Sequence, residues 1–181
     1  MLPLKNSRAV AFVGVLTGLC LAIQLAPRPP NVEFTSLFAF AIGCMFGIGV
    51  GAFFGGFVMF VNGFFSPWGF AGLNMPFQML GMGIVGVAGG LYRRYLRTPN
   101  PAETAVFGAV LTVFYDFVTN LGVAMTYVIA GVDPTLAVVA AIGYGAPFSV
   151  IHVASNVAVF GIVFFPLLKA ADQIVAVRRL G

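Results

Sequence analysis

The stretch Phe34–Phe65 constrains the fold more than any other part of this chain, because it contains no charged residue. As a single helix it would be roughly 48 Å long, whereas the hydrocarbon core of a bilayer is about 30 Å thick. We therefore predict a helical hairpin with a short second span, a turn near Cys44–Gly47 and a third span that ends at Asn62. Glycines recur here at every fourth position, which suits helices packed backbone to backbone: Gly43, Gly47, Gly51 and Gly55.

The distribution of basic residues also requires the hairpin. All of them except Arg28 fall within three short stretches, Lys5–Arg8, Arg93–Arg97 and Lys169–Arg179. Clusters of Lys and Arg beside membrane spans mark the cytoplasmic side. Two clusters on one side need an even number of crossings between them, which a single helix over the uncharged stretch would not provide. We predict six transmembrane helices with both termini in the cytoplasm.

Composition agrees with a membrane protein. Of the 181 residues, 60% are hydrophobic and 8% are charged, against about 25% charged residues in soluble domains. We predict one transmembrane domain over residues 1–181, in the plasma or inner membrane, with no soluble domain. The net charge of +4 does not indicate nucleic-acid binding, because the basic residues flank spans and form no aromatic-laced groove.

The remaining spans follow from apolar runs and from helix-breaking residues. We expect helices over residues 9–26, 75–92 and 105–131, and loops over 27–33 and 66–74. Asp133 and Pro134 predict a helix start, and this helix would reach only Ile142. Gly143–Pro147 would then break or kink it before the sixth span, which continues to Leu168. The expected fold class is therefore an all-α membrane protein with a short second helix and a kinked sixth helix.

Two polar faces stand out within the apolar runs. Asp116 and Asn120 share one face of the fifth helix, and His152 and Asn156 share one face of the sixth. An ionisable residue costs about 2.5–3.5 kcal/mol at the bilayer centre on insertion scales, so it usually points into a bundle and has a function. A buried carboxylate favours a ligand with an amine, hydroxyl or ring N–H group. The alternative is a structural role, with Asp116 protonated and paired inside the bundle.

Several kinds of chemistry lack their sequence signatures. The chain has no G-x-x-x-x-G-K-[ST] phosphate loop, no H-E-x-x-H motif and no G-x-S-x-G elbow. We therefore expect no ATP hydrolysis, no metal site, no cofactor and no enzymatic activity. Asp116 and His152 are expected to form a hydrogen-bonded structural or ligand-contacting pair, because no nucleophile or metal joins them.

Four landmarks together resemble a known family: Pro30–Glu33 before the short second span, Asn62 at the end of the third, Met75–Gln78, and Pro147–Asn156. This pattern is similar to the substrate-capture subunits (S components) of energy-coupling factor (ECF) vitamin transporters. The resemblance implies a six-helix subunit of an ABC-type transporter. Such a subunit captures a vitamin or related micronutrient precursor from outside, together with a transmembrane coupling subunit and two ATPase subunits.

The resemblance also implies roles for individual residues. The family's A-x-x-x-A docking motif would correspond to Gly14, Gly18 and Ala22, although this ridge taken alone favours packing within the chain. Glu33 is typical of a solvated loop residue or a partner for Arg28, but it lies in the loop expected to meet the ligand. The expected substrate-binding residues all lie in the middle and outer half of the membrane: Asn31, Glu33, Trp68, Asn74, Gln78, Asp116, Asn120, Tyr144, His152 and Asn156.

Two other functions remain open at this point. A self-sufficient, proton-coupled permease would use Asp116 and His152 as a proton relay, but the six predicted helices show no evident inverted repeat. A small intramembrane enzyme is the third possibility, and the missing nucleophile and metal set count against it.

Overall fold

The structure is a computed structural model, and it describes residues 7–95 and 100–176. These residues form six α-helices and a single 3₁₀ turn, η1 (Gly72–Asn74). In chain order, the α-helices are α1 (Ser7–Leu25), α2 (Thr35–Phe46), α3 (Ile48–Phe65), α4 (Met75–Tyr95), α5 (Pro101–Ile129) and α6 (Pro134–Ala176). Within the described residues, four helices (α3 to α6) are long and apolar enough to cross a membrane, and α2 and the apolar part of α1 (Ala9–Leu25) are shorter apolar segments. The chain is thus an all-helical, multi-pass membrane protein.

The predicted hairpin is confirmed. Helix α2 ends at Phe46, and α3 begins two residues later at Ile48. Gly47 makes the turn between them with a φ of +98°, a conformation that favours glycine. Helix α3 continues one turn past the predicted end at Asn62, because the carbonyl of Asn62 still accepts a hydrogen bond from the N–H of Ser66. Pro67 follows immediately and cannot extend the ladder.

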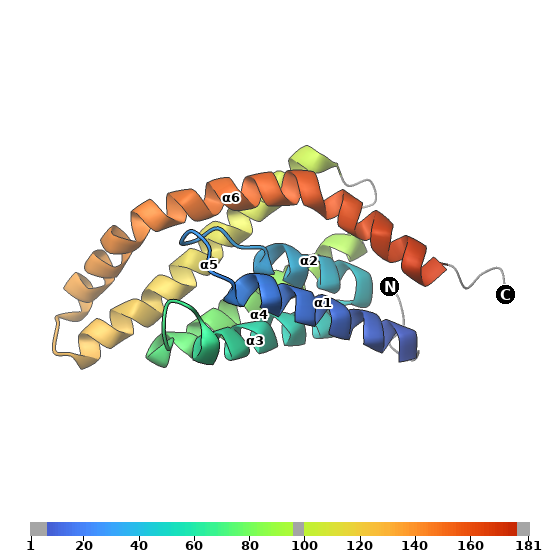
Figure 1. Cartoon of the computed structure of the whole chain (residues 1–181). Coiled ribbons are helices and arrows are strands. Elements are labelled where there is room, and N and C mark those ends of the chain that lie inside the picture. The colour runs from blue at the N-terminus through green and yellow to red at the C-terminus, as the bar shows by residue number, and fades with distance from the viewer. Residues whose placement is uncertain (1–6, 96–99, 177–181) are drawn as a thin grey trace.

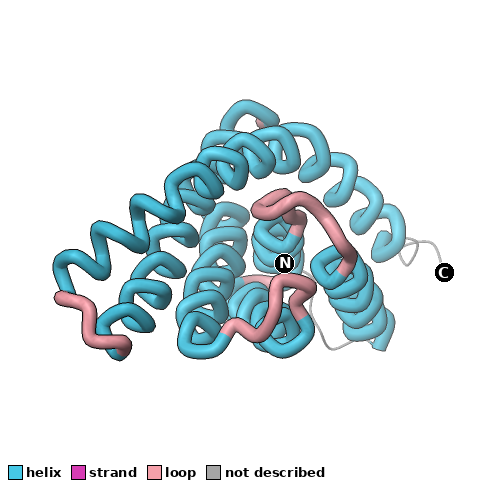
Figure 2. Tube along the Cα trace, turned by 60° about the vertical axis from the view of Figure 1, so that its left-hand side comes forward, coloured by secondary structure: helices cyan, strands magenta, loops and turns pink. Residues whose placement is uncertain are grey.

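Helix α2 is the centre of the bundle. All of its 12 residues are buried, which explains why it is apolar on every side. At 1.5 Å per residue it is only about 18 Å long, so it is too short to cross the membrane as a helix. The prediction of six transmembrane helices is therefore confirmed only in part: six α-helices are present among the described residues, and four of them are long enough to span. The loop before it (residues 26–34) therefore reaches into the bundle. In Figure 2 this loop and the loop of residues 66–71 lie at the same end of the molecule as the turn between α5 and α6.

Helices α2, α3 and α4 meet along what we call the glycine seam, formed by Gly43, Gly51, Gly55, Gly86 and Gly89. A Cβ atom added at Gly86 would collide with the backbone of Gly51. One added at Gly89 would collide with the backbone of Phe40. Because the atoms on both sides of these contacts belong to the backbone, no flexible side chain can move aside to make room for a Cβ atom. The four-residue glycine spacing therefore has the packing role predicted for it.

Helices α5 and α6 form a long antiparallel pair over this bundle (Figure 1). Asn100 caps α5, accepting a hydrogen bond from the N–H of Glu103 at 2.9 Å. Asp133 caps α6 in the predicted way, through the N–H groups of Thr135 and Leu136 at 2.9 and 3.1 Å. Gly143–Pro147 were predicted to break or kink α6, and the break is wrong, because α6 is one continuous helix of 43 residues. A proline inside a helix removes one backbone hydrogen bond, and α6 accommodates this loss by curving, as Figure 1 shows.

Helix α1 lies at the edge of the bundle and turns its small residues outward. Gly14, Gly18 and Ala22 are all exposed. A Cβ atom added at Gly14 or Gly18 would meet nothing within 4 Å. The expectation that this ridge packs within the chain is therefore wrong. The ridge is an open strip along α1.

Candidate functional site

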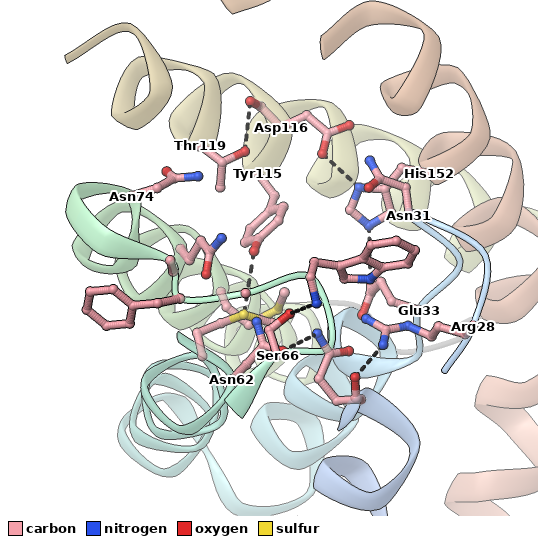
Figure 3. A pocket seen from close by; sticks show the side chains of 18 residues that line it. Arg28, Asn31, Glu33, Asn62, Ser66, Asn74, Tyr115, Asp116, Thr119 and His152 are labelled. Carbon is pink, nitrogen blue, oxygen red and sulfur yellow. Dashed lines mark hydrogen bonds and ion pairs between the residues drawn. The ribbon is translucent and has the colours of Figure 1, made fainter. Parts of the chain in front are cut away.

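A polar cavity of about 360 Å³ lies at the loop end of the bundle (Figure 3). The residues that line it come from α1, α3, η1, α4, α5 and α6 and from the two loops 26–34 and 66–71. It exists because α2 is short, which leaves the space beyond its first turn to loop residues. The polar and aromatic side chains in its lining are Gln24, Arg28, Asn31, Glu33, Asn62, Ser66, Trp68, Phe70, Asn74, Gln78, Tyr115, Asp116, Thr119 and His152.

One wall is a hydrogen-bonded triad of ionisable residues from three parts of the chain. His152 on α6 places Nδ1 2.7 Å from Oδ1 of Asp116 on α5. Its Nε2 lies 3.1 Å from Oε1 of Glu33, in the loop before α2. The three side chains are nearly enclosed, with exposed fractions of 3%, 7% and 6% for His152, Asp116 and Glu33. The predicted pairing of Asp116 with His152 is confirmed as a hydrogen-bonded contact.

Glu33 is the most fully bonded member of the triad. Its Oε1 also accepts a hydrogen bond from Nδ2 of Asn156 at 3.1 Å, and its Oε2 accepts one from the N–H of Ser36 at 3.0 Å. Asn156 donates in addition to Oγ1 of Thr112 at 2.8 Å. Because Ser36 lies in the first turn of α2, Glu33 caps the positive end of that helix. The expectation of a solvated loop carboxylate is wrong, because the loop enters the bundle here.

The geometry of the triad shows how many protons its two contacts require. Each imidazole nitrogen faces a carboxylate oxygen, so each of the two contacts needs one proton. With these two protons, either both carboxylates are charged and the imidazole is cationic, or one carboxylate is charged and the imidazole is neutral. In both cases the three groups together carry one net negative charge. Such a charge is costly in an apolar interior unless hydrogen bonds and helix ends compensate it.

A second polar chain runs along the opposite wall. The hydroxyl of Thr35 donates to Oε1 of Gln24 at 2.9 Å, and Nε2 of Gln24 donates to Oδ1 of Asn62 at 3.1 Å. The thiol of Cys20 donates to Oγ1 of Thr35 at 3.8 Å and is the first group in this series of hydrogen bonds. These contacts orient the Asn62 amide, so that its oxygen is bonded and its nitrogen is left for the cavity.

Arg28 completes the lining from the loop between α1 and α2. Its Nε donates to the carbonyl of Val32 at 2.8 Å, and Nη1 donates to the carbonyl of Gln24. Partial burial lowers the pKa of the Arg28 guanidinium below its ordinary value, although the charge of the nearby Glu33 opposes this shift. The group nevertheless stays protonated, as arginine does in proteins. Arg28 forms no ion pair with any other described residue.

The structure gathers most of the predicted binding residues around this cavity. Asn31, Glu33, Trp68, Asn74, Gln78, Asp116 and His152 all line it. Asn156 lies behind Glu33, where it supports the carboxylate without reaching the cavity. Asn120 lines a separate, mostly apolar side pocket of about 280 Å³ between α5 and α6, and Asp116 borders this pocket too. Tyr144 borders neither space and is 75% exposed.

Other lining residues were absent from the predicted set, and some of them carried a signal. Arg28 is the one basic residue outside the three clusters. Gln24 and Asn62 are isolated amides in apolar helices, and in a membrane such groups usually face a bundle or a cavity. Thr119 lies three residues after Asp116, on the same face of α5, and this spacing was a signal for it. Tyr115 directly precedes Asp116 and could not be assigned without knowing how α5 is rotated. Ser66 and Phe70 lie in the loop of residues 66–71, and Trp68 was the only residue of this loop predicted to bind substrate.

The donor set does not form a metal centre. No group of three or more His, Cys, Asp or Glu residues within 7–95 and 100–176 is arranged to hold an ion. In the triad the two carboxylates contact opposite nitrogens of one imidazole, so their oxygens do not converge on a shared point. No protein-family model, curated protein or solved structure matches this chain.

Proposed function

We propose that this chain is the substrate-binding subunit of an ECF-type ABC transporter. In this role it captures a vitamin or related micronutrient precursor from outside the cell, and it delivers the ligand through a transmembrane coupling subunit driven by two ATPase subunits. The observation that carries the proposal is the polar cavity of about 360 Å³, enclosed by two loops at one end of an apolar helical bundle. Small-ligand sites typically measure about 300–1,000 Å³.

The chemistry of the cavity wall supports binding without reaction. Ionisable side chains inside a membrane bundle are expensive and usually serve a ligand or ion path. The three ionisable residues of the triad are hydrogen-bonded to one another, and the wall offers amides, one guanidinium and aromatic rings. These groups bind and orient a small molecule. We assign ATP hydrolysis to partner subunits, because this sequence has no phosphate-binding loop.

The outward ridge of α1 supports the need for a partner. Gly14, Gly18 and Ala22 form an open strip on which the helix of another membrane subunit can lie closely. In the proposed orientation the termini are cytoplasmic and the cavity opens outside. The coupling subunit would then contact α1 from within the membrane plane while the ligand occupies the far end of the bundle.

Reconstituted transport tests this function. The purified protein is placed in liposomes alone, with a proton or sodium gradient, and uptake of the molecule that co-purifies with it is measured. It is then reconstituted with coupling and ATPase subunits and internal ATP. We expect binding by the chain alone and accumulation only in the ATP-driven complex. Accumulation by the lone protein under a gradient would overturn the proposal.

One observation favours a second candidate, the proton-coupled permease. The chain of contacts from Asp116 through His152 to Glu33 has the geometry of a proton relay, with contacts of 2.7 and 3.1 Å. The same liposome experiment decides between the two. A permease requires only this chain and a proton gradient, and its uptake would be lost in His152→Gln.

A further inference from the structure

The carboxylates in the cavity wall are already engaged, and this changes what the cavity can bind. Glu33 accepts three hydrogen bonds through its two oxygens, from His152, Asn156 and Ser36. Asp116 uses Oδ1 for His152 (Figure 3), and its other carboxylate oxygen, Oδ2, is buried without a hydrogen-bond partner among the described residues. The only unpaired carboxylate oxygen among the triad residues is therefore Oδ2 of Asp116, and it is buried in the wall. An amine in the cavity would have to compete with His152 for the remaining carboxylate oxygens, which weakens the sequence-based expectation of a donor ligand.

The positive charge in the wall is, by contrast, unpaired. The surplus negative charge of the triad lies beside the first turn of α2, where the Ser36 N–H and the helix dipole offset it. Arg28 forms no ion pair with any described residue, although the charge of Glu33 acts on it from nearby. A guanidinium has five N–H groups, and two of those on Arg28 are bound by backbone carbonyls. Those two bonds hold the guanidinium plane in place and leave three N–H groups for another acceptor.

The neighbouring amides present their donor ends. Oδ1 of Asn62 accepts from Gln24, and Nδ2 of Asn62 has no acceptor among the described residues. Oδ1 of Asn74 is buried against Gly122 without a partner, which leaves Nδ2 of Asn74 as the free end. Gln78 is similar, since its Oε1 is buried without a donor. The amide N–H groups of Asn62 and Asn74 are therefore unpaired donors beside Arg28, whereas the unpaired oxygens of Asn74 and Gln78 are buried in the wall. Within the described chain Asn31 is the exception, since its Nδ2 donates to the carbonyl of Phe148 and its oxygen is the free end.

We propose that the cavity binds a monocarboxylate whose carboxylate group is received by Arg28 and by the side-chain amides of Asn62 and Asn74. This inference rests on the proposed function and specifies its substrate class. A guanidinium matches a carboxylate through paired N–H contacts, and such charge-assisted bonds are roughly twice as strong as neutral ones. A second acidic group on the ligand would have no basic partner in the described wall, so one charge is expected. The rest of the molecule lies against Met59, Met82 and the aromatic side chains of Trp68 and Phe70.

Matched pairs of small molecules test the class directly. Isothermal titration in detergent would compare nicotinate with nicotinamide, biotin with biotinamide, and pantothenate with panthenol, each pair differing mainly in its acid group. At least one acid is expected to bind, and at least 10-fold more tightly than its neutral partner. Arg28→Gln should weaken that binding by about 10- to 100-fold, and Arg28→Lys by less. Arg93→Gln serves as the matched control, because Arg93 is exposed at the far end of α4.

Native mass spectrometry covers the case in which no molecule of the set binds. The small molecule carried by the purified protein is released and identified, and a carboxylic acid supports the inference. An amine or a polyanion overturns it while leaving the proposed function standing, as would full affinity in Arg28→Gln. A protein that carries no small molecule and binds none of the set would contradict the proposed function as well. Thermal melting of each variant confirms that lost binding is not lost folding.

Discussion

The triad should behave as one energetic unit, and a double-mutant cycle on Glu33 and His152 can measure this. Glu33→Gln removes a charge from the 3.1 Å contact and weakens the bonds that Asn156 and Ser36 donate to the same carboxylate. Breaking one side of a buried charge pair typically costs about 3–5 kcal/mol, because the other charge stays buried without its partner. We expect a loss of that size for Glu33→Gln, and a similar loss for His152→Gln.

The double variant should lose less than the sum of the two single variants. Once Glu33 is neutral, replacing His152 no longer strands a facing charge at that position. Coupling energies between residues in one network are about 0.5–3 kcal/mol, and this buried contact should lie in the upper half of that range. The assay is the free energy of unfolding, measured by titrating the purified protein with denaturing detergent and following helicity.

Glu103→Gln is the matched control for this cycle. Glu103 is a partly exposed carboxylate in the first turn of α5, near Tyr92; one of its oxygens is buried without a hydrogen-bond partner, and it forms no ion pair within the described part of the chain. Its charge interacts with the helix dipole, which is worth about 0.3–1 kcal/mol, so the expected loss is small. Additive losses for Glu33→Gln and His152→Gln, with a coupling energy below about 0.5 kcal/mol, would refute the view that the triad is one unit.

Three further outcomes follow from the fold. Gly86→Leu should prevent stable folding in detergent, because the new side chain meets the backbone of α3, whereas Gly14→Leu should melt like the parent protein. Changing Gly14 and Gly18 together to leucine should leave ligand binding intact but abolish ATP-driven uptake in the reconstituted complex; retained uptake would remove α1 as the docking surface. A cysteine at position 70 in a cysteine-free background should react with a membrane-impermeant maleimide added outside intact cells, and labelling only from the cytoplasmic side would reverse the proposed topology.

The helices could be predicted from sequence because their causes are local. The uncharged stretch Phe34–Phe65 is too long for one span, and Gly47 supplies the turn conformation that the hairpin needs. Asp133 followed by Pro134 marks the start of α6 through its own backbone contacts. At Gly143–Pro147 the sequence predicted a break or a kink, and the break was wrong because helix-breaking residues were weighed without their surroundings. Packing of α6 along α5 is a tertiary effect that keeps the helix continuous.

The site was predicted less completely, because its contacts join distant parts of the chain. Asp116 and His152 stand out in the sequence as ionisable residues inside apolar runs, and their pairing was expected. Glu33 did not stand out, since a glutamate in a proline-rich loop usually faces water. Its contact with His152 depends on the shortness of α2, which draws the loop into the bundle. The free amide nitrogen of Asn62 depends on a relay through Gln24 and Thr35, and no local pattern encodes its direction.

The glycine seam divides the molecule mechanically. Where backbones touch directly, there are no side-chain rotamers to rearrange, so α2, α3 and α4 should move as one rigid body. Any shape change that admits or releases a ligand then has to occur in the two loops, in α1, or by tilting of the α5–α6 pair against that body. His152 and Asn156 lie on α6, and their contacts with Glu33 cross this boundary. Amide hydrogen exchange should therefore be slowest in α2. When ligand binds, the largest change in exchange rate should occur in residues 26–34 and 66–71.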